Sequence, residues 1–244
     1  MEIAKREDIL IIYAAEAGSR VWGYNTPQSD YDVKFIFAHR ECEYLKLTEP
    51  KDVIVEKFDG MEFEGWDIKK ALKLLYASNA SVFEWTKSTK VYINNPLSQH
   101  LASVIRECYD RRKVAFHYIK LAKKKIAEMG EKAEVSPKDY LFAVRASLSA
   151  KWAIERTDFP ALDISALTKE MVSDYMARKE IEDIKTDRLQ GKHYGRSSLL
   201  DMYLGVMIFN TEGELACNPE RFKKERIDIE KLNKAFRLTV KKVL

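Results

Sequence analysis

A glycine, a serine and an arginine lie together near the N-terminus, and two aspartates follow about ten residues later. The first group is Gly18, Ser19 and Arg20, and the second is Asp30 and Asp32. Glycine lets a backbone approach a phosphate closely, and the N–H groups at a helix start point at anions. Carboxylate oxygens bind Mg²⁺ together with phosphate oxygens of a substrate. The spacing predicts a phosphate-binding turn followed by a metal-binding pair, and so a site for nucleotidyl transfer.

Two predicted strands position these groups. The apolar run 9–14 predicts a buried strand that ends before Gly18, and the run 31–37 predicts a second strand after a loop. Because residues two apart in a strand point to the same face, Asp30 and Asp32 are expected to project together. Tyr31 and Val33 are then expected to enter the core.

Two adjacent carboxylates repel each other, so one of them would normally hold a proton. Bound Mg²⁺ removes this repulsion, and two ions about 3.5–4 Å apart can hold both the attacking and the leaving oxygen. Mn²⁺ prefers similar oxygen ligands and could replace Mg²⁺. The alternative is that Asp30 and Asp32 cap a turn and start a strand, which any Asp-x-Asp could do. The Gly-Ser turn upstream favours metal binding.

A third carboxylate usually completes a site with two metal ions. The strongest candidate is Asp67, which ends the second strand of a hairpin predicted by Asp59-Gly60. There the sheet could place Asp67 beside the pair. An equally good interpretation is an N-cap, because Asp67 directly precedes a helical pattern. Glu16 and Glu64 are weaker candidates, since Glu16 only precedes the turn and Glu64 has the opposite strand parity to Asp67.

Ser19 and Arg20, which precede the aspartate pair, also have purely structural interpretations. The Ser19 hydroxyl could bind the β- or γ-phosphate of a nucleotide, or it could simply cap a helix. Arg20 could pair with a phosphate, although a surface arginine is the commoner case.

Hydrophobic periodicity divides the chain into two domains. An α/β unit is predicted for residues 1–95, and its last helix shows apolar residues at helical spacing over 68–75. Residues 96–244 read as an α-helical domain, so the fold class is α+β. The helices expected there span residues 97–109, 113–129, 137–156, 167–182, 197–209 and 229–240.

The composition excludes several classes of protein. No apolar run approaches the roughly 18 residues of a membrane span, and the charged N-terminus has no signal-peptide core. The three cysteines are far apart and suit a reducing cytoplasm, where we expect the protein to be found. The net charge of +4 permits an anionic partner such as a nucleotide or RNA without requiring one.

A basic stretch with interleaved aromatic residues could hold an RNA backbone. It includes residues 111–113, 120 and 123–125, which lie on or just before the helix predicted over 113–129. A solvated helix face is the favoured alternative, because acidic residues follow at positions 128, 131 and 134.

The residues 17–19 followed by 30–33 resemble the signature of the DNA polymerase β-like nucleotidyltransferase superfamily. The longer runs 16–23 and 29–33 are similar to a YcgL-like predicted nucleotidyltransferase family, which is associated with RNA repair and RNA ligases. Further matches lie at residues 65–72, 78–79, 84–85, 117–118 and 138–145. Ala17 departs from a frequent serine, and residues 146–147 depart from an expected proline-leucine pair.

The resemblance implies a polymerase β-like palm that binds two Mg²⁺ ions. It implies that Asp30 and Asp32 bind the metals and that Asp67 is the third catalytic carboxylate. Gly18 and Ser19 would hold the triphosphate.

Two further contacts with the nucleotide, from Arg20 and Lys69, follow from the resemblance without an assigned role. The implied reaction moves a nucleoside monophosphate from an NTP such as ATP to an acceptor hydroxyl, with release of pyrophosphate. RNA is the first choice of acceptor. The alternatives are a protein partner, as in toxin–antitoxin systems, a small molecule, or a nucleotide sensor that transfers nothing.

Overall fold

The computed structural model describes residues 2–131, 134–192, 194–225 and 227–243. The chain forms two compact units. One contains residues 1–21, 30–109 and 225–244, and the other contains residues 22–29 and 110–224. This division differs from the predicted boundary after residue 95. Helix α6 (Ser98–Cys108) and helix α12 (Ile229–Val240) belong to the first unit and pack on each other, with Lys231 and Glu107 paired at 2.6 Å.

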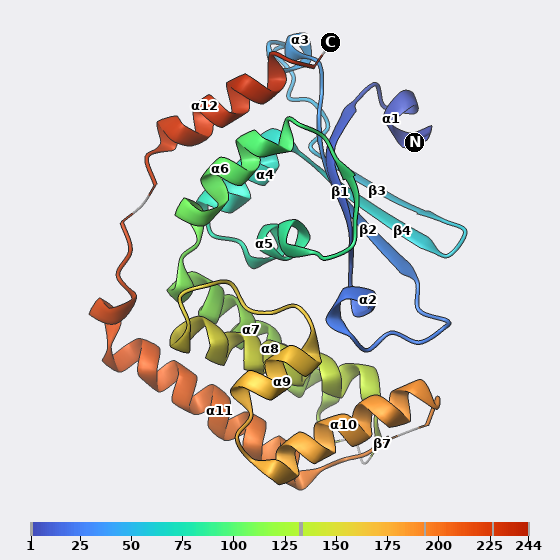
Figure 1. The fold of residues 1–244 in the computed structure, drawn as a ribbon, viewed down its shortest axis with the longest axis vertical. Coiled ribbons are helices and arrows are strands. Elements are labelled where there is room, and N and C mark those ends of the chain that lie inside the picture. The colour runs from blue at the N-terminus through green and yellow to red at the C-terminus, as the bar shows by residue number, and fades with distance from the viewer. Residues whose placement is uncertain (1, 132–133, 193, 226, 244) are drawn as a thin grey trace. The chain divides into compact units, whose positions relative to one another are not determined.

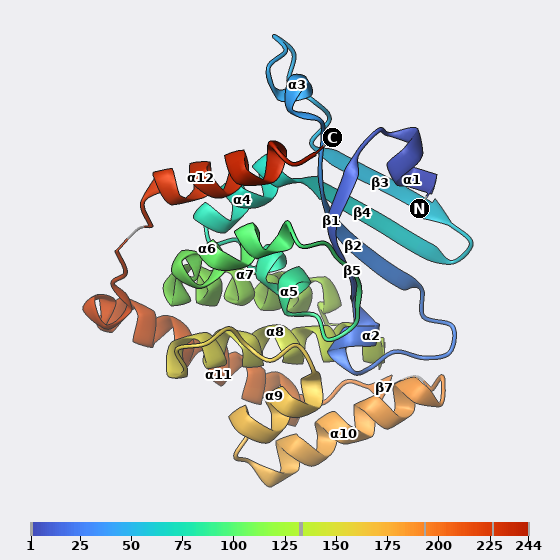
Figure 2. The same cartoon turned by 45° about the horizontal axis from the view of Figure 1, so that its top comes forward.

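The first unit is built on a mixed five-stranded sheet in the order β3-β4-β2-β1-β5 (Figures 1 and 2). The strands are β1 (Leu10–Ala17), β2 (Tyr31–Ala38), β3 (Val53–Phe58), β4 (Met61–Asp67) and β5 (Val91–Asn94). Strands β2 and β4 are parallel, and the other neighbours are antiparallel. The predicted α+β class is confirmed. The hairpin predicted at Asp59-Gly60 is also confirmed, with both residues at positive φ.

Apolar side chains on one face of this sheet form a core under α1 (Glu2–Arg6), with Ile3 of that helix buried among them. On β4, Trp66 stacks on Trp85 of α5 (Ala80–Lys87), with ring centroids 3.7 Å apart. Helix α4 (Ile68–Tyr76) buries its apolar stripe as predicted. Helix α5 and strand β5 were not predicted. The short helices α2 (Ser19–Trp22) and α3 (Glu41–Tyr44) follow β1 and β2.

The second unit is helical. Its elements are α7 (Arg111–Met129), α8 (Pro137–Glu155), α9 (Ile164–Met171), α10 (Tyr175–Leu189), α11 (Ser198–Cys217), the 3-10 helix η1 (Pro219–Phe222), and the short paired strands β6 (Glu134–Val135) and β7 (Tyr194–Gly195). Its core gathers apolar residues of α8, α9, α10 and α11. The single helix predicted over 167–182 is wrong. Asp174 caps a new helix by accepting the Ala177 N–H at 2.7 Å, and so splits the segment.

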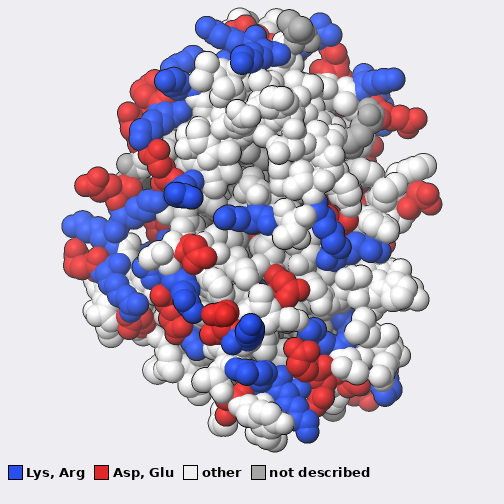
Figure 3. Space-filling view, viewed as in Figure 1, with Lys and Arg blue, Asp and Glu red and all other residues white. Residues whose placement is uncertain are grey.

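The helices of the described ranges are all too short or too polar to cross a membrane. Basic and acidic side chains are intermixed over the face shown in Figure 3. On α7, Lys123 pairs with Glu212, and Lys125 pairs with both Glu128 and Asp139. These ion pairs favour a solvated face for this part of the basic stretch.

Candidate functional site

The glycine turn lies directly against the second aspartate. Gly18 has a φ of +66°, and its neighbour Ala17 is paired with Asp32 in the β1–β2 ladder. A Cβ atom on Gly18 would lie 1.9 Å from Oδ2 of Asp32. The position therefore requires glycine both for its backbone conformation and for the close approach. The structure thus brings together Gly18 and Asp32, two of the predicted site residues.

Ser19 and Arg20 begin the short helix α2. Ser19 is buried, and the guanidinium of Arg20 lies 3.7 Å from the centre of the Tyr31 ring. Arg20 Nε also donates to the backbone oxygen of Asp30 at 3.3 Å. Tyr31 is 46% exposed, so the prediction that it enters the core is wrong. Its ring is covered by a cation instead of by apolar side chains.

The buried residue Glu16 holds the backbone of Asp32 in place. Glu16 is 1% exposed, and its carboxylate accepts the backbone N–H of Asp32 at 2.9 Å and the hydroxyl of Tyr92. Burial and the hydrogen bond from its hydroxyl to Glu16 raise the pKa of Tyr92 to about 12. Ser88 Oγ donates to the backbone oxygen of Glu16 at 2.6 Å. The Glu16 carboxylate is therefore used to fix the Asp32 peptide.

The register between the parallel strands β2 and β4 decides which carboxylate neighbours the pair. Asp32 is opposite Glu62, Lys34 is opposite Glu64, and Phe37 is opposite Asp67. Asp67 is thus five positions along from Asp32, which is roughly 16 Å at about 3.3 Å per residue. It also has the opposite strand parity. The prediction that the sheet places Asp67 beside Asp30 and Asp32 is wrong, and Glu62 lies there instead.

Asp67 makes the contacts of a helix cap. It is 2% exposed, and its carboxylate accepts the Lys69 N–H at 2.7 Å and the Tyr44 hydroxyl at 2.5 Å. Burial raises the pKa of Asp67, and the hydrogen bond from Tyr44 only partly opposes this effect. Lys69, a predicted nucleotide contact, pairs with Glu49 at 2.9 Å near the same end of β4. The alternative interpretation of Asp67 as an N-cap agrees with these contacts.

Lys57 joins the first aspartate to the neighbouring strand. Its Nζ lies 2.5 Å from Glu62 Oε1 and 3.9 Å from Asp30 Oδ2. The hydrogen bond to Glu62, followed by the charges of Glu62 and Asp30, raises the pKa of Lys57. One ammonium thus reaches both carboxylates. Glu62 and Glu64 are two residues apart, so the sequence already predicts that they share the sheet face opposite to that of Asp67. Only the pairing of β4 with β2 shows that Glu62 is the neighbour of Asp32.

A sequence model described as the RNA repair pathway DNA polymerase beta family matches residues 1–237 of the chain. The chain belongs to this family. It is also similar to the protein named "Uncharacterized protein YcgL" from Bacillus subtilis (strain 168), with 29% identity over 196 residues. That alignment covers 80% of this chain and 75% of the relative. The resemblance noted from the sequence is thereby confirmed, and membership indicates a nucleotidyltransferase of the polymerase β type.

The side chains at this site are of the chemical type that a hard divalent cation prefers. Asp30, Asp32 and Glu62 offer carboxylate oxygens, and the Lys57 ammonium shows that a positive charge is accommodated between two of them. Within the residues that the structure describes, no three His, Cys, Asp or Glu side chains are grouped closely enough to hold a metal ion. Metal binding by this polymerase beta family member therefore stays a prediction.

The close approach of Gly18 to Asp32 predicts a specific loss of stability. Gly18→Ala and Gly60→Ala both place alanine at a positive φ, which costs roughly 1–2 kcal/mol. A Cβ on Gly60 has nothing within 4 Å, whereas one on Gly18 meets Asp32. We expect Gly18→Ala to lower the free energy of unfolding in urea by about 1–3 kcal/mol more than Gly60→Ala, as overpacking does.

A double-mutant cycle locates the cause of that difference. Adding Asp32→Ala to Gly18→Ala removes the atoms that the new methyl group meets, and should recover most of the excess loss. Equal losses in the two single glycine variants, or no recovery in the double variant, would show that the turn and Asp32 are not packed against each other.

Proposed function

We propose that this protein transfers a nucleoside monophosphate from an NTP to an acceptor hydroxyl, with RNA as the first choice of acceptor. The observation that carries the proposal is the Gly18 turn packed against Asp32, with Glu62 as the strand neighbour of that aspartate. Membership of the RNA repair pathway DNA polymerase beta family supports it. The polymerase β-like palm is the fold that this proposal assigns to the five-stranded unit.

The turn binds the triphosphate in this proposal. Backbone N–H groups of the turn could donate to phosphate oxygens, and the buried Ser19 starts α2 directly after Gly18. Helix α2 has only four residues, so in this proposal the phosphate contacts come from the whole turn and from the Ser19 hydroxyl. Lys57 is a further cation at the site, since it already lies within 3.9 Å of Asp30. Arg20 supports the backbone of Asp30 and stacks on Tyr31.

Asp30, Asp32 and Glu62 would hold the divalent cations, with Mg²⁺ as the first choice and Mn²⁺ as a substitute. When bound, Mg²⁺ neutralises charge on the departing pyrophosphate and lowers the pKa of the acceptor hydroxyl. Glu62 replaces Asp67 in the third position, because the register puts it opposite Asp32. With a cation held by these carboxylates, the ammonium of Lys57 would be available to phosphate oxygens instead.

The acceptor oxygen attacks the α-phosphorus, a new P–O bond forms, and the bond between the α-phosphorus and the bridging oxygen breaks. The hydroxyl proton leaves to a carboxylate of the site, a role that we assign to Glu62 as the third carboxylate, and pyrophosphate departs. Most of the rate enhancement would come from positioning the reactants and from neutralising charge. The buried Glu16 contributes by fixing the Asp32 peptide.

The test is a transfer assay with α-labelled NTPs, Mg²⁺ and total cellular RNA. We expect label to move into RNA from at least one NTP, to disappear on ribonuclease treatment, and to be absent when a chelator removes the metal. Label in a protein band or a small molecule would retain the transferase and change the acceptor. Mg²⁺-dependent NTP binding without label in any fraction would favour a nucleotide sensor over the transferase.

A further inference from the structure

Helix α11 of the second unit is apolar on two opposite sides. Its inner side includes Leu200, Leu204 and Met207, which are buried in the core of that unit. Its outer side carries four large apolar residues, with exposed fractions of 36% for Leu199, 68% for Met202, 53% for Val206 and 75% for Phe209. A helix that is hydrophobic all round is normally buried on all sides. The outer side of α11 is therefore suited to burial by another surface.

The four exposed residues form one continuous stripe. Their spacings of three, four and three residues place them on a single side of a helix, as in the seam of a coiled coil. We call this stripe the outer seam of α11. A third of the residues in the whole chain are charged, but none of the four is. The outer seam is thus an uncharged surface whose residue spacing suits packing against another helix.

The charged residues of α11 lie beside the outer seam, and each has a partner within the chain. Asp201 pairs with Arg196 at 2.6 Å, Glu212 pairs with Lys123 at 2.6 Å, and Glu214 pairs with Arg221. These acidic groups are locally neutralised, so two copies of the seam can meet without a net repulsion of like charges. A partner with a charged surface would lose hydration without gaining a counter-charge from the seam.

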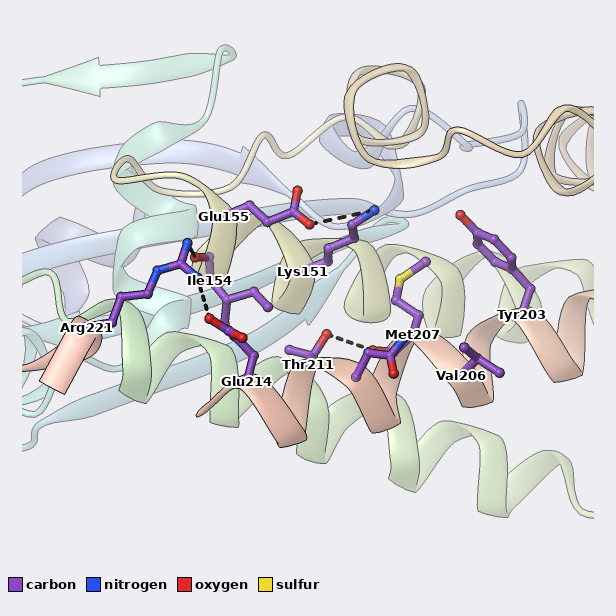
Figure 4. A pocket seen from close by; sticks show the side chains of 10 residues that line it. Lys151, Ile154, Glu155, Tyr203, Val206, Met207, Thr211, Glu214 and Arg221 are labelled. Atoms are coloured by element: carbon purple, nitrogen blue, oxygen red, sulfur yellow. Dashed lines mark hydrogen bonds and ion pairs between the residues drawn. The ribbon is translucent and has the colours of Figure 1, made fainter. Parts of the chain in front are cut away.

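A groove runs along one edge of the outer seam. Its volume is about 450 Å³, and it is lined by α8, α11 and η1, including Lys151 and Glu155 on one side and Tyr203 and Val206 on the other. Figure 4 shows these side chains around it. Val206 belongs to both the groove and the seam, and Phe209 projects one turn further along the helix. The surface thus has an exposed aromatic group and a hollow with room for one.

We propose that the outer seam of α11 is the interface between two copies of this chain. A surface that carries both a projecting side chain and a receiving groove is self-complementary, which is what a two-fold interface requires. Four exposed apolar side chains on one helix are a small contact set beside the extensive apolar interfaces of obligate dimers. We therefore expect a dimer with a Kd in the micromolar range rather than an obligate one.

Sedimentation velocity and light scattering test this proposal between about 1 and about 100 μM, the range that brackets a micromolar Kd. The full chain should approach twice its mass of 28.4 kDa as the concentration rises. Phe209→Glu and Met202→Glu should each stay monomeric at the highest concentration, because the interface would bury an unpaired charge. Both replaced side chains face solvent, so we expect unchanged thermal unfolding.

Leu189→Glu is the matched control, since Leu189 is 61% exposed at the end of α10 in the same unit. It should dimerise like the unmodified chain. A monomer throughout the range, or a dimer that survives both seam variants, would overturn the proposal. Loss of the dimer in Leu189→Glu as well would also count against it, by showing a non-specific effect of added charge. None of these measurements depends on nucleotidyl transfer.

Discussion

Replacing Asp32 with asparagine is expected to lower nucleotidyl transfer by at least about a thousandfold, which is roughly 4 kcal/mol of transition-state stabilisation. Asp32 adjoins the Gly18 turn and is opposite Glu62, so under the proposed function it would link the triphosphate to the metal ions. Asparagine has nearly the same shape but is a far weaker ligand for Mg²⁺. Asp30→Asn should have a similar effect, and the double variant should show no transfer above background.

The fold is expected to survive these changes. Glu16 contacts the backbone N–H of Asp32, which asparagine keeps, and the Asp30 side chain is 52% exposed. The thermal unfolding temperature without metal should therefore stay close to that of the unmodified chain. Stabilisation by added Mg²⁺ should shrink in the variants, since fewer carboxylates bind the ion in the native state. Substantial transfer by both single variants would refute the assignment of the pair.

Local patterns carried much of what could be predicted from the sequence. The turn at Gly18, the strand that follows Asp30 and the hairpin at Asp59-Gly60 each depend on a few adjacent residues. Helix α12 was also predicted at its observed bounds, because its apolar residues recur at helical spacing between an N-cap aspartate and its end. These features need no knowledge of distant contacts.

Features that depend on distant pairing could not be predicted in the same way. The choice between Glu62 and Asp67 rests on which strand adjoins β2 and in which direction it runs, and a hairpin alone does not determine either. Tyr31 looked like a core residue because it alternates with two aspartates, but Arg20 covers its ring at the sheet surface. The compact units of the structure differ from the boundary predicted after residue 95 for a similar reason, since α12 lies near the C-terminus in sequence but packs on α6.

The contrast between two carboxylates gives the sharpest test of the third catalytic position. Glu62→Gln is expected to lower transfer by at least about a hundredfold, as for loss of a group that stabilises transition-state charge. Asp67→Asn is expected to leave transfer within a few-fold of the unmodified chain. Asparagine caps helices as well as aspartate does, so the free energy of unfolding should change by no more than about 1 kcal/mol.

Asp67→Ala completes this comparison. It removes the acceptor of the Lys69 N–H and leaves the Tyr44 hydroxyl without its 2.5 Å partner, so we expect a loss of about 1–3 kcal/mol in the free energy of unfolding. Initial rates should be compared at a temperature where all variants are folded. If Asp67→Asn instead abolished transfer while Glu62→Gln did not, the role implied by the family resemblance would hold for Asp67. The sheet register would then describe an arrangement other than the catalytic one, because a carboxylate roughly 16 Å along the strands cannot bind the same metal ions as Asp32.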